Sequence, residues 1–190
     1  MDVVLATSNP GKVHEARAIL AGSDIRIQAS PLWFGEVETG VSFEENARLK
    51  AAAAYRMVNR AVLAEDAGIE VDALGGLPGI HSARFAGPSA TAGDNNAKVL
   101  RLLDGVPDPR TARYRAVVIL RLPTGREIVG EGVMEGRLIS IPRGEGGFGY
   151  DPLFVPEGDE RTVAEMRDAE KNEISHRAKA IRAVLAALRS

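Results

Sequence analysis

The chain of 190 residues is long enough for one domain with its own hydrophobic core, so we expect residues 1–190 to form a single domain. It contains no cysteine, which excludes a disulfide framework and a thiolate metal site and fits a reducing compartment. Its formal net charge of −2 argues against a protein that binds duplex nucleic acid. It shows neither the basic start of a signal peptide nor the apolar run of about 18 residues that a membrane span needs, so we expect a cytoplasmic protein without a membrane partner.

The chain begins with the pattern of a strand, a polar turn and a helix. Asp2–Ala6 is a short apolar run typical of a buried strand, and residues 13–20 have helical periodicity. The turn between them, Thr7–Lys12, contains proline and glycine and opens the helix. Free N–H groups and the helix dipole suit such a turn to a phosphate, and Lys12 adds a positive charge. The alternative is an ordinary capped turn.

A second strand is expected at Ile25–Ala29, followed by an irregular stretch, residues 31–41, that carries Glu36 and Glu38. Ser42 and Glu45 then form the pattern of a capping box, which predicts an alanine-rich helix to about residue 60. The capping pattern gives Glu45 a local structural role. Glu38 has no such local role, which makes it the better candidate for a metal ligand.

The third predicted strand, Ala61–Ala64, is expected to end in the acidic sequence Glu65-Asp66-Ala67-Gly68. Adjacent carboxylates among apolar residues are costly unless they are solvated, paired or bound to a cation. The carboxyl ends of strands bind ligands in α/β sheets, and Mg²⁺ prefers carboxylate oxygens. With Glu38, the pair would form a carboxylate cluster opposite Lys12. The alternative is a plain turn that ends the strand.

The middle of the chain predicts a helix over residues 91–103 and an antiparallel hairpin of residues 112–122 and 127–135. A glycine-rich segment, Arg143–Phe154, follows the hairpin. Glycines are expected where the backbone turns at positive φ or lets a ligand come close. Phe148 and Tyr150 can stack on a flat ring, and Asp151 can accept hydrogen bonds from it. The alternative is a surface loop between strands.

The last predicted helix carries an apolar stripe at spacings of four and three residues, from Ile174 to Leu188. Lys171, His176 and Arg177 lie just off this stripe. Three potential cations on one segment would form a surface that faces an anion. The alternative is a solvated start of the helix.

Together these segments resemble the inosine triphosphate pyrophosphatase-like (Ham1) family, in particular the bacterial-type XTP/dITP diphosphatases. The resemblance covers essentially the whole chain. It rests on Thr7–Lys12, Thr39–Ala47, Gly75–Gly79 with Ser82–Arg84, Gly146–Pro152 and Glu170–Arg177. The sequence departs from the family's usual Asp-Asp-Ser-Gly at residues 65–68, where Ala67 lacks the serine hydroxyl. Any contact of Ala67 with a ligand must therefore come from its backbone N–H.

The resemblance implies hydrolysis of non-standard purine triphosphates (ITP, dITP and XTP) to the monophosphate and pyrophosphate, with Mg²⁺ as cofactor and a homodimer as the assembly. It assigns Asp66 as a metal ligand and catalytic base, and Glu38 as a further metal ligand. The residues that it assigns to substrate binding are Thr7, Ser8, Asn9, Pro10, Gly11, Lys12, Ala67, Phe148, Gly149, Tyr150, Asp151, Lys171, His176 and Arg177.

We expect an α/β fold in which a long, mixed, twisted central sheet has helices on both sides and the nucleotide occupies a cleft between two lobes, as in Maf-like and Ham1-like proteins. One alternative function is that of a Maf-like pyrophosphatase acting on pyrimidine or modified nucleotides. Another is that of a nucleotide-binding protein without catalysis, against which the intact carboxylates argue.

Overall fold

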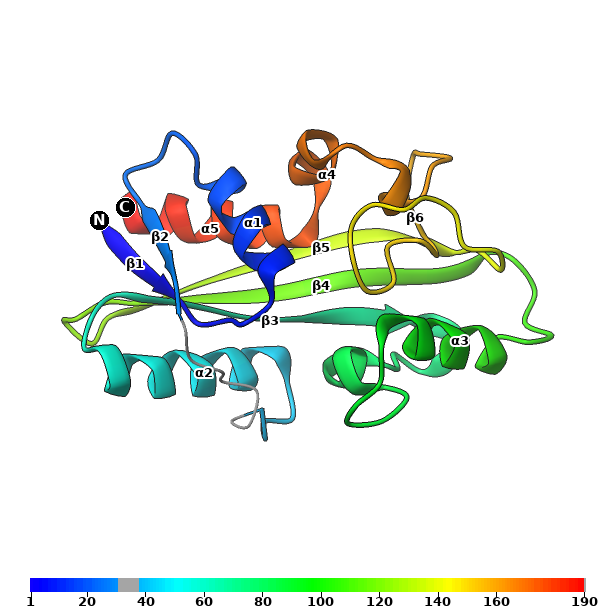
Figure 1. Cartoon of the computed structure of the whole chain (residues 1–190), viewed down its shortest axis with the longest axis horizontal. Helices are drawn as coiled ribbons and strands as arrows, with labels where there is room; N and C mark the ends of the chain where they lie inside the picture. Colours follow the sequence, from blue (N-terminus) through cyan, green and yellow to red (C-terminus); the bar gives the residue numbers. More distant parts are fainter. Residues whose placement is uncertain (31–37, 190) are drawn as a thin grey trace. The chain divides into compact units, whose positions relative to one another are not determined.

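A computed structural model of the chain describes residues 1–30 and 38–189 (Figure 1). The described strands form one six-stranded sheet in the order β2-β1-β3-β4-β5-β6. The strands are β1 Asp2–Leu5, β2 Arg26–Ala29, β3 Val62–Val71, β4 Arg110–Arg121, β5 Glu127–Leu138 and β6 Phe154–Pro156. The α-helices are α1 Pro10–Ile19, α2 Phe43–Val58, α3 Ala92–Leu102, α4 Asp168–Ile174 and α5 His176–Arg189. Short 3₁₀ helices are η2 Asp72–Leu74, η3 Gly79–Arg84 and η4 Val163–Glu165.

The sheet is mixed, as expected. Strand β1 pairs in parallel with β2, where Val3 lies opposite Ile27, and with β3, where Leu5 lies opposite Leu63. Strand β6 pairs antiparallel with β5, where Gly136 lies opposite Pro156. The predicted hairpin is confirmed as β4 and β5, whose turn at residues 122–126 is closed by a 2.9 Å hydrogen bond from Leu122 N to Arg126 O.

The chain divides into two compact units. The first unit consists of Met1–Asp66, Ala116–Gly132 and Ser175–Ser190, and the second of Ala67–Arg115 and Val133–Ile174. Strands β3, β4 and β5 each contribute residues to both units. Neither unit is therefore a continuous piece of the chain. The single domain 1–190 and the cleft between lobes stay predictions.

In the first unit, helices cover both faces of the strands: α1 and α5 lie on one face and α2 on the other (Figure 1). Helix α5 packs very closely on β5, because a Cβ atom at Gly132 would lie 2.0 Å from the carbonyl oxygen of His176. Alanines at positions 47, 51 and 54 are fully buried and let α2 pack closely as well. Fully buried strand residues are Val3, Val62, Ala64, Val118, Ile119 and Leu120.

The second unit has its own hydrophobic core. Helix α3 covers one face of its strands, and the chain from β5 to α4 covers the other (Figure 1). The core residues are Ile69, Val71, Val99, Leu103, Ala112, Tyr114, Met134, Leu138, Tyr150, Leu153, Phe154 and Val163.

Two expected boundaries were wrong. The third strand does not end at Ala64 but continues as β3 through Glu65, Asp66 and Gly68 to Val71. The cations that pair with the two carboxylates allow them to lie within a buried strand. The last helix is divided at Ser175 into α4 and α5, so Ile174 belongs to the core of the second unit and not to the stripe of α5.

The expected irregular stretch, residues 31–41, lies mostly outside the described residues, including Glu36, although Glu38 is described. Each described helix is either too short or too polar to cross a membrane.

Candidate functional site

The phosphate turn, residues Thr7–Lys12, joins β1 to α1 in the first unit. Asn9 is the N-cap of α1: its side-chain oxygen accepts hydrogen bonds from Gly11 N at 2.9 Å and from Lys12 N at 3.3 Å. Asn9 N in turn donates to Thr7 Oγ1 at 3.2 Å. Side chains of the turn therefore occupy the amides of Asn9, Gly11 and Lys12 in this structure, as expected of an Asn N-cap, and binding of phosphate by the turn stays a prediction.

The adjacent carboxylates of Glu65 and Asp66 point to opposite faces of the sheet, because successive side chains of a strand alternate. Glu65 contacts Lys12 of α1 and Arg177 of α5, whereas Asp66 contacts Asn46 and Lys50 of α2. Strand β1 ends at Leu5, which pairs with Leu63, and Ala6 N donates to Leu63 O at 2.8 Å. The acidic pair therefore lies just past the end of β1, beside the phosphate turn.

On the first face, Glu65 belongs to a buried ionic network. Arg177 donates to it through two parallel hydrogen bonds, both of 2.7 Å, and also binds the carboxylate of Glu15. Lys12 Nζ lies 3.5 Å from Glu65 Oε1. The Arg177 side chain is only 2% exposed, so this guanidinium is held by protein carboxylates.

On the opposite face, the carboxylates of Glu38 and Asp66 converge on a single ammonium group. Lys50 Nζ donates to Glu38 Oε1 at 2.9 Å and to Asp66 Oδ1 at 2.8 Å. Asn46 Nδ2 donates to the other oxygen of Asp66 at 3.1 Å. Every described partner of the Asp66 carboxylate therefore comes from α2.

Burial and the charges of neighbouring groups shift the pKa values of these side chains. Burial raises the pKa of Asp66, and the nearby Glu38 adds to this, against the attraction of Lys50. Burial lowers the pKa of Lys12, although the charge of Glu65 opposes the shift. Burial alone would raise the pKa of Glu65, but the charge of Arg177 outweighs it and holds this pKa far below its usual value.

The pair Glu38 and Asp66 fits a divalent metal that the substrate helps to bind. Among residues 1–30 and 38–189, no group of three or more Asp, Glu, His or Cys side chains is arranged to hold a metal by itself. Mg²⁺ is commonly held by one or two carboxylates together with water and substrate phosphates. Two carboxylates that already converge on one cation provide that donor set.

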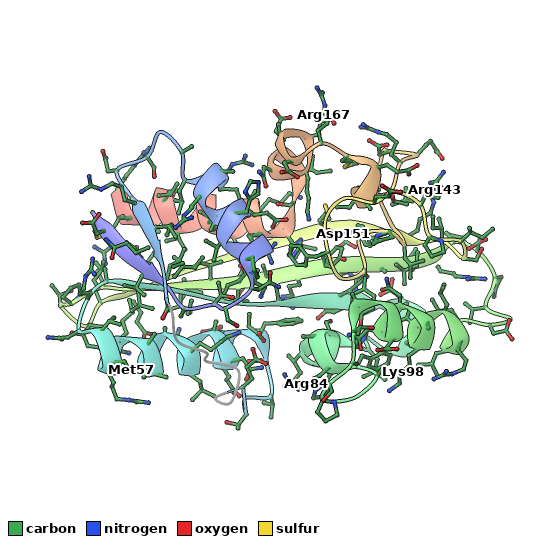
Figure 2. All side chains as sticks on the ribbon, viewed as in Figure 1. Met57, Arg84, Lys98, Arg143, Asp151 and Arg167 are labelled. Carbon is green, nitrogen blue, oxygen red and sulfur yellow. The ribbon has the colours of Figure 1, made fainter. Side chains whose placement is uncertain are left out.

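The glycine-rich segment in the second unit is organised around Asp151. This carboxylate accepts hydrogen bonds from Phe148 N at 2.9 Å, Tyr114 Oη at 3.1 Å and Lys171 Nζ at 2.7 Å. Gly147 approaches it with φ of 69°, and a Cβ there would lie 2.2 Å from Asp151 Oδ2. The glycine-rich sequence thus allows the loop to close on a buried carboxylate. Asp151 lies on the side of the loop that faces the strands, whereas Arg167 points away from them (Figure 2).

The aromatic residues of this segment are fixed by the same unit. Lys171 Nζ lies 4.8 Å from the centre of the Phe148 ring, a cation–π distance. Tyr150 is buried and donates to Ser82 O at 2.9 Å. Asn96 Nδ2 donates to Gly149 O at 3.1 Å. Phe148, Gly149, Asp151 and Lys171 therefore form one assembly, which we call the aromatic cluster.

The structure groups the predicted site residues into two sets. Thr7–Lys12, Glu38, Asp66, His176 and Arg177 belong to the first unit, and Ala67, Phe148–Asp151 and Lys171 to the second. Lys171 lies with the aromatic segment, as expected. Arg177 forms ion pairs with Glu65 and Glu15 in the structure, and its expected contact with the substrate stays a prediction.

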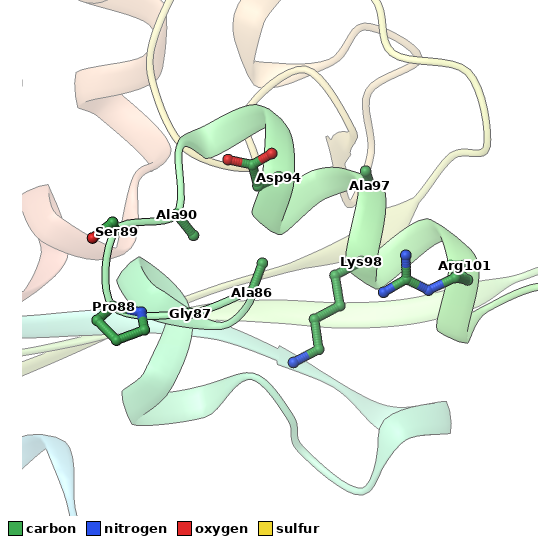
Figure 3. Close-up of a pocket in the computed structure, with 9 residues that line it drawn as sticks. All are labelled: Ala86, Gly87, Pro88, Ser89, Ala90, Asp94, Ala97, Lys98 and Arg101. Carbon is green, nitrogen blue, oxygen red and sulfur yellow. The ribbon is translucent and has the colours of Figure 1, made fainter.

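A separate open cavity of about 610 Å³ lies beside α3 in the second unit (Figure 3). It is lined by small residues from Ala86 to Ala90 and, from α3, by Asp94, Ala97, Lys98 and Arg101. None of the predicted site residues lines it.

Sequence reasoning missed Asn46, Lys50 and Glu15. All three are buried polar residues on helices, with exposures of 0, 5 and 6%. Asn46 and Lys50 are four residues apart on the same face of α2 as the buried alanines. Polar residues within an otherwise apolar helical stripe would have revealed them, because such positions are costly unless partners are present.

Comparisons with known proteins identify relatives of the whole chain. The model of the Ham1 family matches residues 3–187. A "dITP/XTP pyrophosphatase" of Symbiobacterium thermophilum is 51% identical over 180 residues, which cover 94% of this chain and 90% of that protein. A protein of the same name from Geobacillus kaustophilus is 48% identical over 185 residues, covering 95% and 90%. The structure of a HAM1 protein from Coxiella burnetii has a TM-score of 0.87 at 34% identity, covering 100% of this chain and 98% of that one.

Proposed function

Because this chain belongs to the Ham1 family, we propose that it hydrolyses the non-canonical purine nucleoside triphosphates dITP, ITP and XTP to the nucleoside monophosphate and pyrophosphate. It is an enzyme that cleaves a phosphoric anhydride bond, and its action would remove these nucleotides from the pool of precursors.

The observation that carries this proposal is the convergence of Glu38 and Asp66 on one buried cation, beside the phosphate turn. A triphosphate is strongly anionic, and water approaches its phosphorus only when part of that charge is neutralised. Lys12 and Lys50 provide positive charge from this chain. Mg²⁺, which we infer to be the cofactor, would be held by Glu38 and Asp66 and would supply further charge neutralisation and a more acidic water.

Asp66 is the proposed general base. Burial and the charge of Glu38 raise its pKa in the metal-free protein. Its carboxylate would lie beside the proposed metal and could accept the proton of the attacking water. The bond that breaks joins the α- and β-phosphates, because the products are a monophosphate and pyrophosphate, and we assign the attack of water to the α-phosphorus with pyrophosphate as the leaving group. The phosphate turn would bind the leaving phosphates, with Asn9 releasing the amides of Gly11 and Lys12 or sharing them with the phosphate.

We assign recognition of the purine ring to the aromatic cluster. Phe148 offers a flat face, and Asp151 holds Phe148 N and Lys171 in place. Hypoxanthine and xanthine carry a hydrogen-bond acceptor at position 6, where adenine has an amino donor. A protein donor at that position, for which Lys171 of the aromatic cluster is the proposed source, would reject adenine by about 1–3 kcal/mol. The homodimer also stays a prediction.

Release of pyrophosphate from a panel of nucleotides tests this function. We expect kcat/KM for dITP, ITP and XTP to exceed that for ATP roughly 10- to 100-fold, with no turnover when EDTA removes divalent metal. A preference for dTTP or UTP would instead support a Maf-like pyrophosphatase. Tight binding of dITP without pyrophosphate release would support a non-catalytic sensor.

Substitution of the proposed base tests the mechanism. Asp66→Asn should lower kcat by about 10²- to 10⁴-fold, because it removes the proton acceptor. Asp72→Asn is the matched control: Asp72 follows the same strand but pairs with Thr111 and Arg113 at the surface. Full activity of the Asp66→Asn enzyme would remove Asp66 from its assigned role.

A further inference from the structure

Asn46 is buried completely and bridges two parts of the first unit. Its side-chain oxygen accepts a hydrogen bond from Gly40 N at 2.8 Å, and its side-chain nitrogen donates to Asp66 Oδ2 at 3.1 Å. The two neighbours fix the orientation of the amide, because Gly40 N can only donate and the carboxylate accepts. Asn46 therefore connects the strand that carries Asp66 with a backbone position two residues after Glu38.

The contact with Gly40 is close. A Cβ atom at residue 40 would lie 2.9 Å from Asn46 Oδ1 and 2.7 Å from Glu45 Cβ. The segment that carries Glu38 is thus pressed against the start of α2, where Ser42 caps the helix and Glu45 accepts from Val41 N at 2.8 Å. Asn46 links this segment to the Asp66 carboxylate through one hydrogen bond to each.

Asn46 differs from Lys50, the other described partner of Asp66, because its side chain carries no charge. Lys50 donates to Asp66 Oδ1, but its ammonium would be repelled by a divalent cation held between Glu38 and Asp66. The amide of Asn46 is neutral and can keep its hydrogen bond beside such a cation. A donor of this kind fixes one carboxylate oxygen and leaves the other for chemistry.

We propose that Asn46 is a positioning residue of the reaction, which orients the Asp66 carboxylate and ties it to the segment carrying Glu38. This inference rests on the proposed function, in which Asp66 is the base. Loss of the donor misaligns that base and lowers kcat without weakening the binding of the nucleotide.

The chain offers a matched control in Asn95. Asn46 and Asn95 are each the fourth residue of a helix, after a Ser or Thr N-cap, and both are buried. Asn95 also accepts from a backbone N–H, that of Ala86 at 2.7 Å, but it donates to a backbone carbonyl, that of Ala83 at 3.1 Å. Of the two side chains, only Asn46 donates a hydrogen bond to a carboxylate.

Two substitutions at each position separate the hydrogen bonds. Asn46→Asp keeps the acceptor for Gly40 N and removes the donor to Asp66, with an added charge. Asn46→Leu has nearly the same size and removes both hydrogen bonds without adding a charge. Loss of the donor is the effect that the two variants share. Asn95→Asp and Asn95→Leu make the same changes where no carboxylate is involved.

We expect both Asn46 variants to lower kcat for dITP by about 10- to 100-fold, while the affinity for a non-hydrolysable dITP analogue stays within about threefold. Both Asn95 variants should keep the kcat of the wild type, although their thermal unfolding midpoints fall. The measurements are steady-state kinetics, calorimetric titration with the analogue and thermal unfolding of each variant.

Other outcomes would overturn the inference. A loss of kcat in Asn46→Leu alone would assign the effect to the Gly40 contact, and a loss in Asn46→Asp alone would assign it to the added charge. A parallel loss of kcat and analogue affinity, or an equal loss in the Asn95 variants, would show a structural role only. A wild-type protein that releases no pyrophosphate from dITP, ITP or XTP would reject the proposed function together with this inference, whereas active Asn46 variants of an active enzyme would reject the inference alone.

Discussion

At the scale of single residues, buried charges of both signs surround the acidic pair of the first unit. The charged side chains that form ion pairs there include Lys12, Glu15, Glu38, Lys50, Glu65, Asp66 and Arg177. Buried charges are tolerated only when partners balance them, and one ammonium group, that of Lys50, donates to both Glu38 and Asp66. Two carboxylates that converge on one ammonium group are suited to attract a divalent cation.

Replacement of Lys50 tests this balance. Lys50→Met should lower the free energy of unfolding in metal-free buffer by about 3–5 kcal/mol, because Glu38 and Asp66 lose their shared cation. Added Mg²⁺ should then raise the unfolding midpoint of the variant more than that of the wild type. Lys98→Met is the control, because Lys98 contacts only the backbone oxygen and the ring of Phe85 among its described partners. Equal responses of all three proteins to Mg²⁺ would argue against a metal at this pair.

At the scale of elements, close packing of helices on strands positions the functional side chains. Helix α5 begins with His176 and Arg177, and it approaches β5 so closely that residues 130 and 132 of the strand are glycines. From this position Arg177 contacts Glu65 and Glu15. Helix α2 similarly presents Asn46 and Lys50 to Asp66 from one turn to the next, because residues four apart share a helix face.

Gly132→Ala should therefore disturb the site from a distance. Its new methyl group would overlap the backbone of α5, which must move away, and overpacking of this kind costs about 1–3 kcal/mol or more. The unfolding midpoint should fall by several degrees, at about 2–4 °C per kcal/mol for a chain of this size, and kcat should fall with it. Gly93→Ala is the control, because its methyl group would have only an ordinary contact 3.6 Å from Thr91 Oγ1. Equal stability of the two variants would contradict the packing argument.

At the scale of the whole molecule, the chain passes between the two units four times, at residues 66/67, 115/116, 132/133 and 174/175. Three of these passages lie within strands, so unfolding one unit would leave half of β3, β4 and β5 without its continuation. This connectivity favours a single cooperative domain.

Calorimetry tests this expectation. Thermal unfolding should be one transition whose calorimetric and van 't Hoff enthalpies agree. Gly132→Ala in the first unit and Gly147→Ala in the second should each shift the entire transition to lower temperature. Two separate transitions, with only one of them moved by each substitution, would show that the units unfold independently.

The sequence by itself predicted the elements and most of their order. Apolar patterns identified β1, α1, the hairpin of β4 and β5, and the stripe of α5, because such patterns report which face of a local element is buried. The cap at Ser42 was also predicted and is confirmed. The Ham1 resemblance followed from short segments whose residue types and order are readable in the chain itself.

Only the tertiary structure decided which charges meet. Arg177 pairs with Glu65 across 112 residues of sequence, and Lys50 with Asp66 across 16. It also showed that Glu65 and Asp66 lie within β3 and that their side chains point to opposite faces of the sheet. Local patterns carry no information on partners so far apart, because the pairing of a buried charge depends on the position of every element that surrounds it.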